Sequence, residues 1–178
     1  ALKEGFKSFY NIETYDLEPH LSSCDSIDQL ISKVGIIFIS VPTPMNQDGS
    51  SNIDIIKSTI EKIASCNKNN NKIIVIKSTV PPGTTRLLSD QYTNLDIFFN
   101  PEFLTEANFI EDFKNQDRII LGGSKKSISK LKELYIKVFP GAKIIETEST
   151  IAEMVKYLAN TFLATKVSFA NEMKIICD

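Results

Sequence analysis

The alternation of short apolar runs with helix-like segments along the 178 residues predicts an α/β fold. The apolar runs are rich in β-branched residues and show little polar alternation, which is typical of strands covered on both faces. These predicted strands lie at residues 34–41, 72–76, 97–99, 119–121 and 143–146. Apolar positions at helical spacing predict intervening helices at residues 26–33, 53–66, 84–92 and 128–138. Strands that alternate with helices imply βαβ units, so we expect a Rossmann-like parallel sheet flanked by helices.

The two ends of the chain carry further predicted elements. Residues 1–9 have the pattern of a helix end, and residues 11–16 alternate in polarity and predict a short strand with an acidic end. From Ser149 or Thr150 one helical pattern runs to the end, which we expect to be the start of a long central helix. The chain begins without a methionine and stops within this pattern, so we interpret it as a fragment of a longer protein.

Composition excludes several classes of function. A net charge of -2, from 20 basic and 22 acidic residues, provides no electrostatic basis for binding nucleic acid or an anionic membrane. No stretch reaches the roughly 18 apolar residues of a membrane span, and the first residues lack the apolar core of a signal peptide. Cys24, Cys66 and Cys177 show no disulfide or metal-binding spacing, and one histidine argues against a metal site. We expect a cytoplasmic protein without a metal.

Two carboxylates follow one of the predicted strands directly. Asn100-Pro101 ends the strand at residues 97–99, and Glu102 and Glu106 come next with Phe103 and Leu104 between them. In open α/β folds the carboxyl edge of the sheet is where ligands bind. We therefore expect this pair to belong to a site at that edge.

Two other strand ends share one arrangement of hydroxyl residues and prolines. The segments at residues 40–44 and 77–84 each follow an apolar strand, and prolines constrain their backbones. Hydroxyls and backbone amides at one sheet edge would suit an uncharged ribose or nicotinamide. When either segment is taken alone, strand termination with capping of the next helix by Thr84 or Thr85 is the favoured interpretation.

Asp16 stands where dinucleotide-binding folds place the acidic residue that holds a ribose hydroxyl. That residue normally follows a glycine-rich fingerprint by about 20 residues, and this chain contains no such fingerprint. A solvated carboxylate is the alternative interpretation of Asp16.

Lys156 and Asn160 lie four residues apart on the predicted terminal helix and therefore share one face. A cation and an amide that converge in this way would stabilise a developing oxyanion. The alternative is a solvated helix face on which Lys156 pairs with Glu153.

Taken in order, the motifs resemble the UDP-glucose/GDP-mannose dehydrogenase family of nucleotide-sugar 6-dehydrogenases, and its UDP-glucose branch in particular. The resemblance spans nearly the whole chain. It is carried by Val41-Pro42-Thr43-Pro44, Lys77-Ser78-Thr79-Val80-Pro81-Pro82-Gly83-Thr84, Asn100-Pro101-Glu102-Phe103-Leu104-Thr105-Glu106, Asp117-Arg118-Ile119, Glu153-x-x-Lys156-x-x-x-Asn160, Phe162-Leu163-Ala164 and Asn171-Glu172.

The resemblance implies that the full-length protein oxidises UDP-glucose to UDP-glucuronate in two NAD-dependent steps. A cysteine would trap the intermediate aldehyde, and water would release the acid from the resulting thioester. The implied catalytic residues are Thr79, Glu102, Lys156 and Asn160. A dehydrogenase of GDP-mannose or another nucleotide sugar, and a non-catalytic nucleotide-sugar-binding module, are the alternatives.

The resemblance also implies binding residues and a domain division. NAD would be held by Asp16, Ser40, Val41, Pro42, Thr43, Pro44, Ser78, Thr79, Val80 and Glu106. The UDP-sugar would be held by Glu102, Phe103, Leu104, Thr105, Glu106, Lys156 and Asn160. Residues 1–147 would form a partial NAD-binding domain, and residues 148–178 would begin a helical domain through which the full-length protein forms a homodimer.

The chain departs from the family pattern at both ends. The glycine fingerprint would precede Ala1, and the nucleophilic cysteine would lie beyond Asp178. None of the three cysteines occupies the position of the nucleophile. We therefore predict that the 178-residue chain is inactive by itself.

Overall fold

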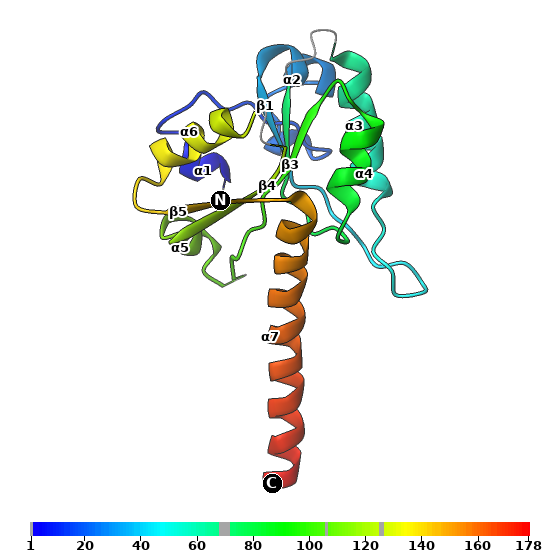
Figure 1. Cartoon of the computed structure of the whole chain (residues 1–178), viewed down its shortest axis with the longest axis vertical. Helices are drawn as coiled ribbons and strands as arrows, with labels where there is room; N and C mark the ends of the chain where they lie inside the picture. Colours follow the sequence, from blue (N-terminus) through cyan, green and yellow to red (C-terminus); the bar gives the residue numbers. More distant parts are fainter. Residues whose placement is uncertain (1, 68–71, 106, 125–126) are drawn as a thin grey trace.

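The computed structural model describes residues 2–67, 72–105, 107–124 and 127–178. A five-stranded sheet in the order β1-β2-β3-β4-β5 lies at the centre of the fold, with helices on both of its faces (Figure 1). The strands are β1 (Ile36–Ile39), β2 (Ile73–Ile76), β3 (Asp96–Phe99), β4 (Arg118–Gly123) and β5 (Lys143–Thr147). The helices are α1 (Leu2–Phe6), α2 (Ile27–Lys33), α3 (Asp54–Cys66), α4 (Thr84–Gln91), α5 (Phe109–Lys114), α6 (Ile128–Val138) and α7 (Ser149–Cys177), with a 3-10 turn at Pro19–Leu21. The predicted α/β architecture, ending in a long helix, is confirmed.

The sheet is not wholly parallel, which corrects the prediction. β1, β2 and β3 pair in parallel and β4 pairs in parallel with β5, but β3 and β4 are antiparallel. A parallel return requires a crossover that spans the whole sheet. The connection at residues 100–117 instead turns back at the edge, where Asn100 Nδ2 donates to the carbonyl oxygen of Ile120 at 2.8 Å. The amino end of β4 therefore lies at the same edge as the carboxyl ends of β1, β2 and β3.

The predicted strand at residues 11–16 is wrong. The segment is extended, but its backbone is hydrogen-bonded to residues 22–24 rather than to a strand. The amide of Thr14 donates to Ser23 Oγ at 2.8 Å, and the amide of Asp16 donates to Ser22 Oγ at 2.8 Å. Serine hydroxyls here take the place of a strand ladder, and alternation of polarity alone could not distinguish the two.

The core lies on both faces of the sheet. β2 is buried along its whole length, and successive side chains point to opposite faces. Ile74 and Ile76 join the cluster under α3 and α4, whereas Ile73 and Val75 join the cluster under α1, α5 and α6. This two-sided burial is the physical reason for the uninterrupted apolar run in the sequence.

Helix α7 packs on the sheet only at its beginning and then projects away from it, with the carboxyl terminus at its far end (Figure 1). Ala152 and Glu153 are fully buried, whereas every residue from 158 onward is exposed. In the described part of the chain, no helix combines the length and apolar character needed to span a bilayer. The first turn of α7 crosses β4 closely, and this brings the next turn to the sheet edge where the predicted site lies.

Candidate active site

The two hydroxyl-rich segments meet at one edge of the sheet, as predicted. Ser78 Oγ donates to the carbonyl oxygen of Val41 at 2.6 Å. Thr43 Oγ1 donates to the carbonyl oxygen of Thr79 at 2.9 Å. These hydrogen bonds join the segments that follow the parallel strands β1 and β2 at the carboxyl edge of the sheet.

Lys77, directly after β2, places a buried ammonium beside Glu102. Only 4% of the Lys77 side chain is exposed. Its Nζ donates to Asn100 Oδ1 at 2.9 Å and lies 3.7 Å from a carboxylate oxygen of Glu102. Burial lowers the pKa of Lys77 to about 8, and the negative charge of Glu102 opposes that shift. The sequence contained the signal, a lysine at the end of a wholly apolar strand, but we assigned it no role.

Asn100 anchors the turn that leads to Glu102. Its Oδ1 accepts from both Lys77 Nζ and the hydroxyl of Tyr135, and its Nδ2 donates to β4. Burial raises the pKa of Tyr135, and the charge of Glu102 adds to this effect. The buried amide is thus bonded on three sides, which determines where the chain leaves β3.

Lys156 approaches the same turn from α7. Its Nζ donates to the backbone carbonyl oxygen of Glu102 at 2.6 Å and lies 5.7 Å from the centre of the Phe103 ring. The guanidinium carbon of Arg118, at the amino end of β4, lies 5.8 Å from the centre of that ring. Partial burial lowers the pKa of Lys156, and the charge of Glu102 opposes this shift. Lys156 therefore lies against the turn that carries Glu102, instead of pairing with Glu153 on a solvated helix face.

Glu153 does not pair with Lys156 but caps α4. Its carboxylate accepts from the amide of Gly83 at 2.6 Å and from the amide of Thr85 at 2.7 Å, and the residue is fully buried. The predicted capping by Thr84 or Thr85 is wrong, because the hydroxyl of Thr84 donates backward to the carbonyl oxygen of Pro81. Gly83 itself has a φ of 97°, a left-handed conformation that favours glycine.

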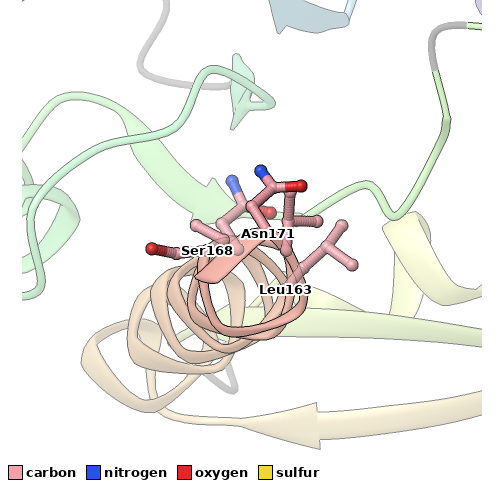
Figure 2. A pocket seen from close by; sticks show the side chains of 6 residues that line it. Leu163, Ser168 and Asn171 are labelled. Carbon is pink, nitrogen blue, oxygen red and sulfur yellow. The ribbon is translucent and has the colours of Figure 1, made fainter. Parts of the chain in front are cut away.

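A pocket of about 420 Å³ brings Thr79 and Asn160 together. The hydroxyl-rich segments and α7 supply its walls: Thr43, Ser51, Thr79, Tyr157, Asn160, Thr161 and Ala164. A larger hollow of about 500 Å³ lies further along α7 and includes Leu163, Ser168 and Asn171 (Figure 2). All of its lining residues belong to α7. That hollow is one face of a single helix, so the smaller pocket is the better candidate for ligand binding.

The other predicted site residues lie in different surroundings. The amide and hydroxyl of Thr105 donate to one carboxylate oxygen of Asp112 at 2.8 and 2.6 Å, and Leu104 packs against the second core cluster. The carboxylate of Asp16 accepts from the amide of Glu18, and among the described residues no hydrogen bond or ion pair joins Asp16 to Lys156 or Glu102. Glu106 lies outside the described residues.

Comparison with known proteins identifies the family. The NAD binding domain of the UDP-glucose/GDP-mannose dehydrogenase family matches residues 12–139, and the central domain of the same family matches residues 150–178. The chain belongs to the UDP-glucose/GDP-mannose dehydrogenase family. The resemblance found in the sequence motifs is thereby confirmed.

Relatives within this family match most of the chain. It is 36% identical to the UDP-glucose 6-dehydrogenase of Rickettsia bellii over 179 residues, which cover 97% of this chain and 37% of that protein. It is 35% identical to UDP-glucose 6-dehydrogenase TuaD of Bacillus subtilis over 192 residues, which cover all of this chain and 41% of that protein. The chain therefore spans about two fifths of the length of these relatives.

Solved structures agree with the family. A UDP-glucose dehydrogenase from Pyrobaculum islandicum superimposes with a TM-score of 0.76 at 32% identity, over 84% of this chain and 37% of that one. A ternary complex of GDP-mannose dehydrogenase from Pseudomonas aeruginosa superimposes with a TM-score of 0.72 at 29% identity, over 82% of this chain and 36% of that one.

NAD is the cofactor of the matched domain, and the donor groups at the sheet edge are compatible with it. Hydroxyls of Thr43, Ser51 and Thr79 line the pocket, which bears no charged side chain. Neutral hydrogen-bonding groups of this kind suit ribose hydroxyls and an amide. The pocket and the hydroxyl-rich segments therefore fit part of a dinucleotide.

Proposed function

We propose that the full-length protein containing this chain is a UDP-glucose 6-dehydrogenase that oxidises the C6 alcohol of the sugar to a carboxylate. One observation carries the proposal. Lys156 from α7 and Lys77 after β2 both engage Glu102, the first at its backbone carbonyl and the second beside its carboxylate. This cluster shares the carboxyl edge of the sheet with the pocket that contains Thr79 and Asn160.

Cofactor binding is assigned to the segments after β1 and β2. When bound, NAD would supply the hydride acceptor, with one NAD molecule consumed in each of the two oxidations. Thr43 and Thr79 offer hydroxyls at the pocket, whereas Val80 is buried and supports the loop. The residues assigned in these segments are Ser40, Val41, Pro42, Thr43, Pro44, Ser78, Thr79 and Val80. Asp16, which precedes β1 in the chain, and Glu106, which follows β3, are also assigned to the cofactor.

Lys156 and Asn160 are assigned to the C6 oxygen of the sugar. They lie one turn apart on α7, so a cation and an amide would converge on an oxygen that loses its proton. Partial burial lowers the pKa of Lys156, so this nitrogen gives up a proton more readily than the nitrogen of a fully exposed lysine does.

Glu102 is assigned to the release of the product. A cysteine in the part of the protein beyond this chain would carry the acyl group as a thioester, and water would have to attack it. The Glu102 carboxylate, 39% exposed, has both access to solvent and a fixed neighbour in Lys77. We propose that it orients this water and accepts its proton, with Thr79 contributing a hydroxyl.

UDP-glucose is favoured over GDP-mannose by the relatives. Two proteins named UDP-glucose 6-dehydrogenase match this chain over 97% and 100% of its length. We assign Phe103, Leu104 and Thr105 to the sugar pocket, with Phe103 lying against both Lys156 and Arg118. GDP-mannose is the second candidate substrate, because the fold superimposes nearly as well on a GDP-mannose dehydrogenase.

We also propose a domain division, an assembly state and a location. Residues 1–147 would be part of the NAD-binding domain, and residues 148–178 would begin the helical domain that joins two copies in a cytoplasmic homodimer. The exposed apolar side chains on α7 support a covered helix, since such residues seldom remain in water together. They include Leu158, Phe162, Leu163, Val167 and Phe169.

The test uses the full-length protein with NAD and a panel of UDP-glucose, GDP-mannose and UDP-N-acetylmannosamine. We expect two NADH per UDP-glucose and little turnover of the other sugars. Lys156→Ala should lower kcat by about 100-fold or more, the scale for losing one oxyanion donor. The matched control is Lys166→Ala, which removes an exposed lysine nearly three turns further along α7.

Three results would contradict the proposal. Preference for GDP-mannose would move the protein to the other branch of the family. Oxidation of none of the sugars would favour a binding module. A loss of turnover in Lys156→Ala that is accompanied by a large fall in the melting temperature would show that the lysine serves packing rather than chemistry.

A further inference from the structure

Lys77 neighbours Glu102, but the proposed reaction gives it no chemical step of its own. Its ammonium lies under the turn that carries Glu102, with 4% of the side chain exposed, so it cannot reach a sugar. Two oxygens surround it, Asn100 Oδ1 at 2.9 Å and the Glu102 carboxylate at 3.7 Å. Any effect of Lys77 on the reaction must therefore pass through one of these two neighbours.

Asn100 does not depend on Lys77 alone. Its Oδ1 also accepts from the hydroxyl of Tyr135, and its Nδ2 donates to Ile120. The turn would thus keep two of its three side-chain hydrogen bonds if Lys77 lost its ammonium. Glu102 differs, because among the described residues Lys77 is the cation within ion-pair distance of its carboxylate.

The two lysines hold different parts of Glu102. Lys156 donates to its backbone carbonyl, whereas Lys77 lies beside its carboxylate. A half-exposed glutamate has three rotatable side-chain bonds, and water competes for its carboxylate. A buried cation on one side limits these rotamers and keeps the carboxylate close to one position.

We infer that Lys77 is a positioning residue that holds the Glu102 carboxylate in place for hydrolysis of the acyl-enzyme thioester. This inference rests on the proposed function. In the step, the water oxygen bonds to the acyl carbon while one water proton passes to Glu102. The carbon–sulfur bond breaks, the cysteine sulfur leaves with its electron pair and takes the proton from Glu102, and the product is the free acid. Lys77 itself exchanges no proton and contacts no reacting atom.

A purely structural role for Lys77 makes a different prediction. If Lys77 only supports the turn through Asn100, every step of the reaction should slow together when it is removed. If it positions the carboxylate, the two oxidations should proceed and hydrolysis alone should slow. The covalent intermediate then accumulates, and its mass can be detected independently of turnover.

The experiment treats full-length Lys77→Met with UDP-glucose and NAD and measures intact protein mass and NADH over time. We expect a rapid burst of about two NADH per subunit, a mass increase equal to the UDP-glucuronyl group, and steady turnover at least tenfold below that of the unchanged protein. Glu102→Gln should give the same adduct. Tyr135→Phe, which perturbs Asn100 and leaves the Lys77–Glu102 pair intact, should give none.

The outcomes separate the inference from the proposed function. Failure of the unchanged protein to oxidise UDP-glucose rejects the proposed function and the inference with it. If the unchanged protein is active but Lys77→Met turns over slowly without accumulating the UDP-glucuronyl adduct, the inference alone is overturned. The inference is also overturned if Tyr135→Phe accumulates as much of this adduct as Lys77→Met does. If Lys77→Met does not fold, Lys77→Gln undergoes the same test, and the adduct or its absence decides in the same way.

Discussion

The buried carboxylate of Glu153 joins α7 to α4, and its removal should loosen both. In Glu153→Ala the amides of Gly83 and Thr85 lose their acceptor. Both amides lie at the start of α4, where no neighbouring side chain caps the helix in place of Glu153. The residue is fully buried, so water would reach these amides only after a local rearrangement. We expect the first turn of α4 to fray and α7 to lose its attachment beside Lys156.

The magnitude follows from the two hydrogen bonds. Each buried amide left without a partner costs about 1–3 kcal/mol, and loss of a helix cap typically costs about 1 kcal/mol. Relief from burying a carboxylate offsets part of this cost. We expect Glu153→Ala to destabilise the α4–α7 contact by about 3 kcal/mol. Glu153→Gln keeps the volume and one acceptor, so its cost should be about 2 kcal/mol.

The assay is hydrogen–deuterium exchange of the full-length protein, followed in peptides that cover residues 83–91. Destabilisation by about 3 kcal/mol corresponds to roughly a 100-fold rise in the local opening constant. Glu172→Ala, at an exposed position on the same helix, is the control and should leave exchange in α4 unchanged. Unchanged exchange in Glu153→Ala would refute the reasoning, since the carboxylate would then contribute nothing to the cap.

Two further substitutions test close packing and the buried lysine. Gly122→Ala should lower the free energy of unfolding by about 2–3 kcal/mol in thermal or urea unfolding, because the added Cβ would lie 2.5 Å from the Cβ of Ala152. The control is Gly35→Ala, whose added Cβ has no neighbour within 4 Å and should leave the free energy of unfolding unchanged. The ammonium of Lys77 has a pKa of 10.5 in the unfolded chain and a pKa of about 8 in the folded protein. Between these two pH values the unfolded state binds more protons, so the free energy of unfolding rises with pH. Relative to Lys77→Met, the unchanged protein should gain up to about 3 kcal/mol over that range in urea unfolding; a difference independent of pH would contradict the lowered pKa.

The elements that depend on neighbouring residues were the ones predicted well. The helix expected at residues 128–138 has those bounds, and the helix expected at residues 26–33 is α2 with Ser26, which accepts from the amide of Gln29 at 3.2 Å, as its cap. Helical periodicity and side-chain caps involve residues three or four apart, so the sequence displays them directly. The carboxyl-edge placement of the segments after β1 and β2 was also predictable, because parallel strands end at the same edge.

The errors share one cause, which is hydrogen bonding of side chains to backbone amides outside their own helix or strand. Residues 11–16 alternate like a strand, yet the hydroxyls of Ser22 and Ser23 accept from the amides of Asp16 and Thr14. Pairing of Glu153 with Lys156 along their own helix was the alternative interpretation of that segment, yet Glu153 caps α4, about 70 positions away. Neither outcome leaves a local trace, since each depends on which backbone groups the fold happens to bring near.

By itself, the sequence determined the α/β class, the carboxyl-edge location of the hydroxyl-rich segments, the family and the candidate residues of the site, because periodicity, turn chemistry and ordered motifs are local. Only the tertiary structure decided the antiparallel direction of β4 and the cap supplied by Glu153. It also decided that two lysines, from β2 and α7, hold the same glutamate from opposite ends. Such arrangements arise from burial and hydrogen bonding between segments far apart in the chain. A buried polar group that is left without a hydrogen-bond partner costs free energy, so the group pairs with whichever partner the fold brings within reach.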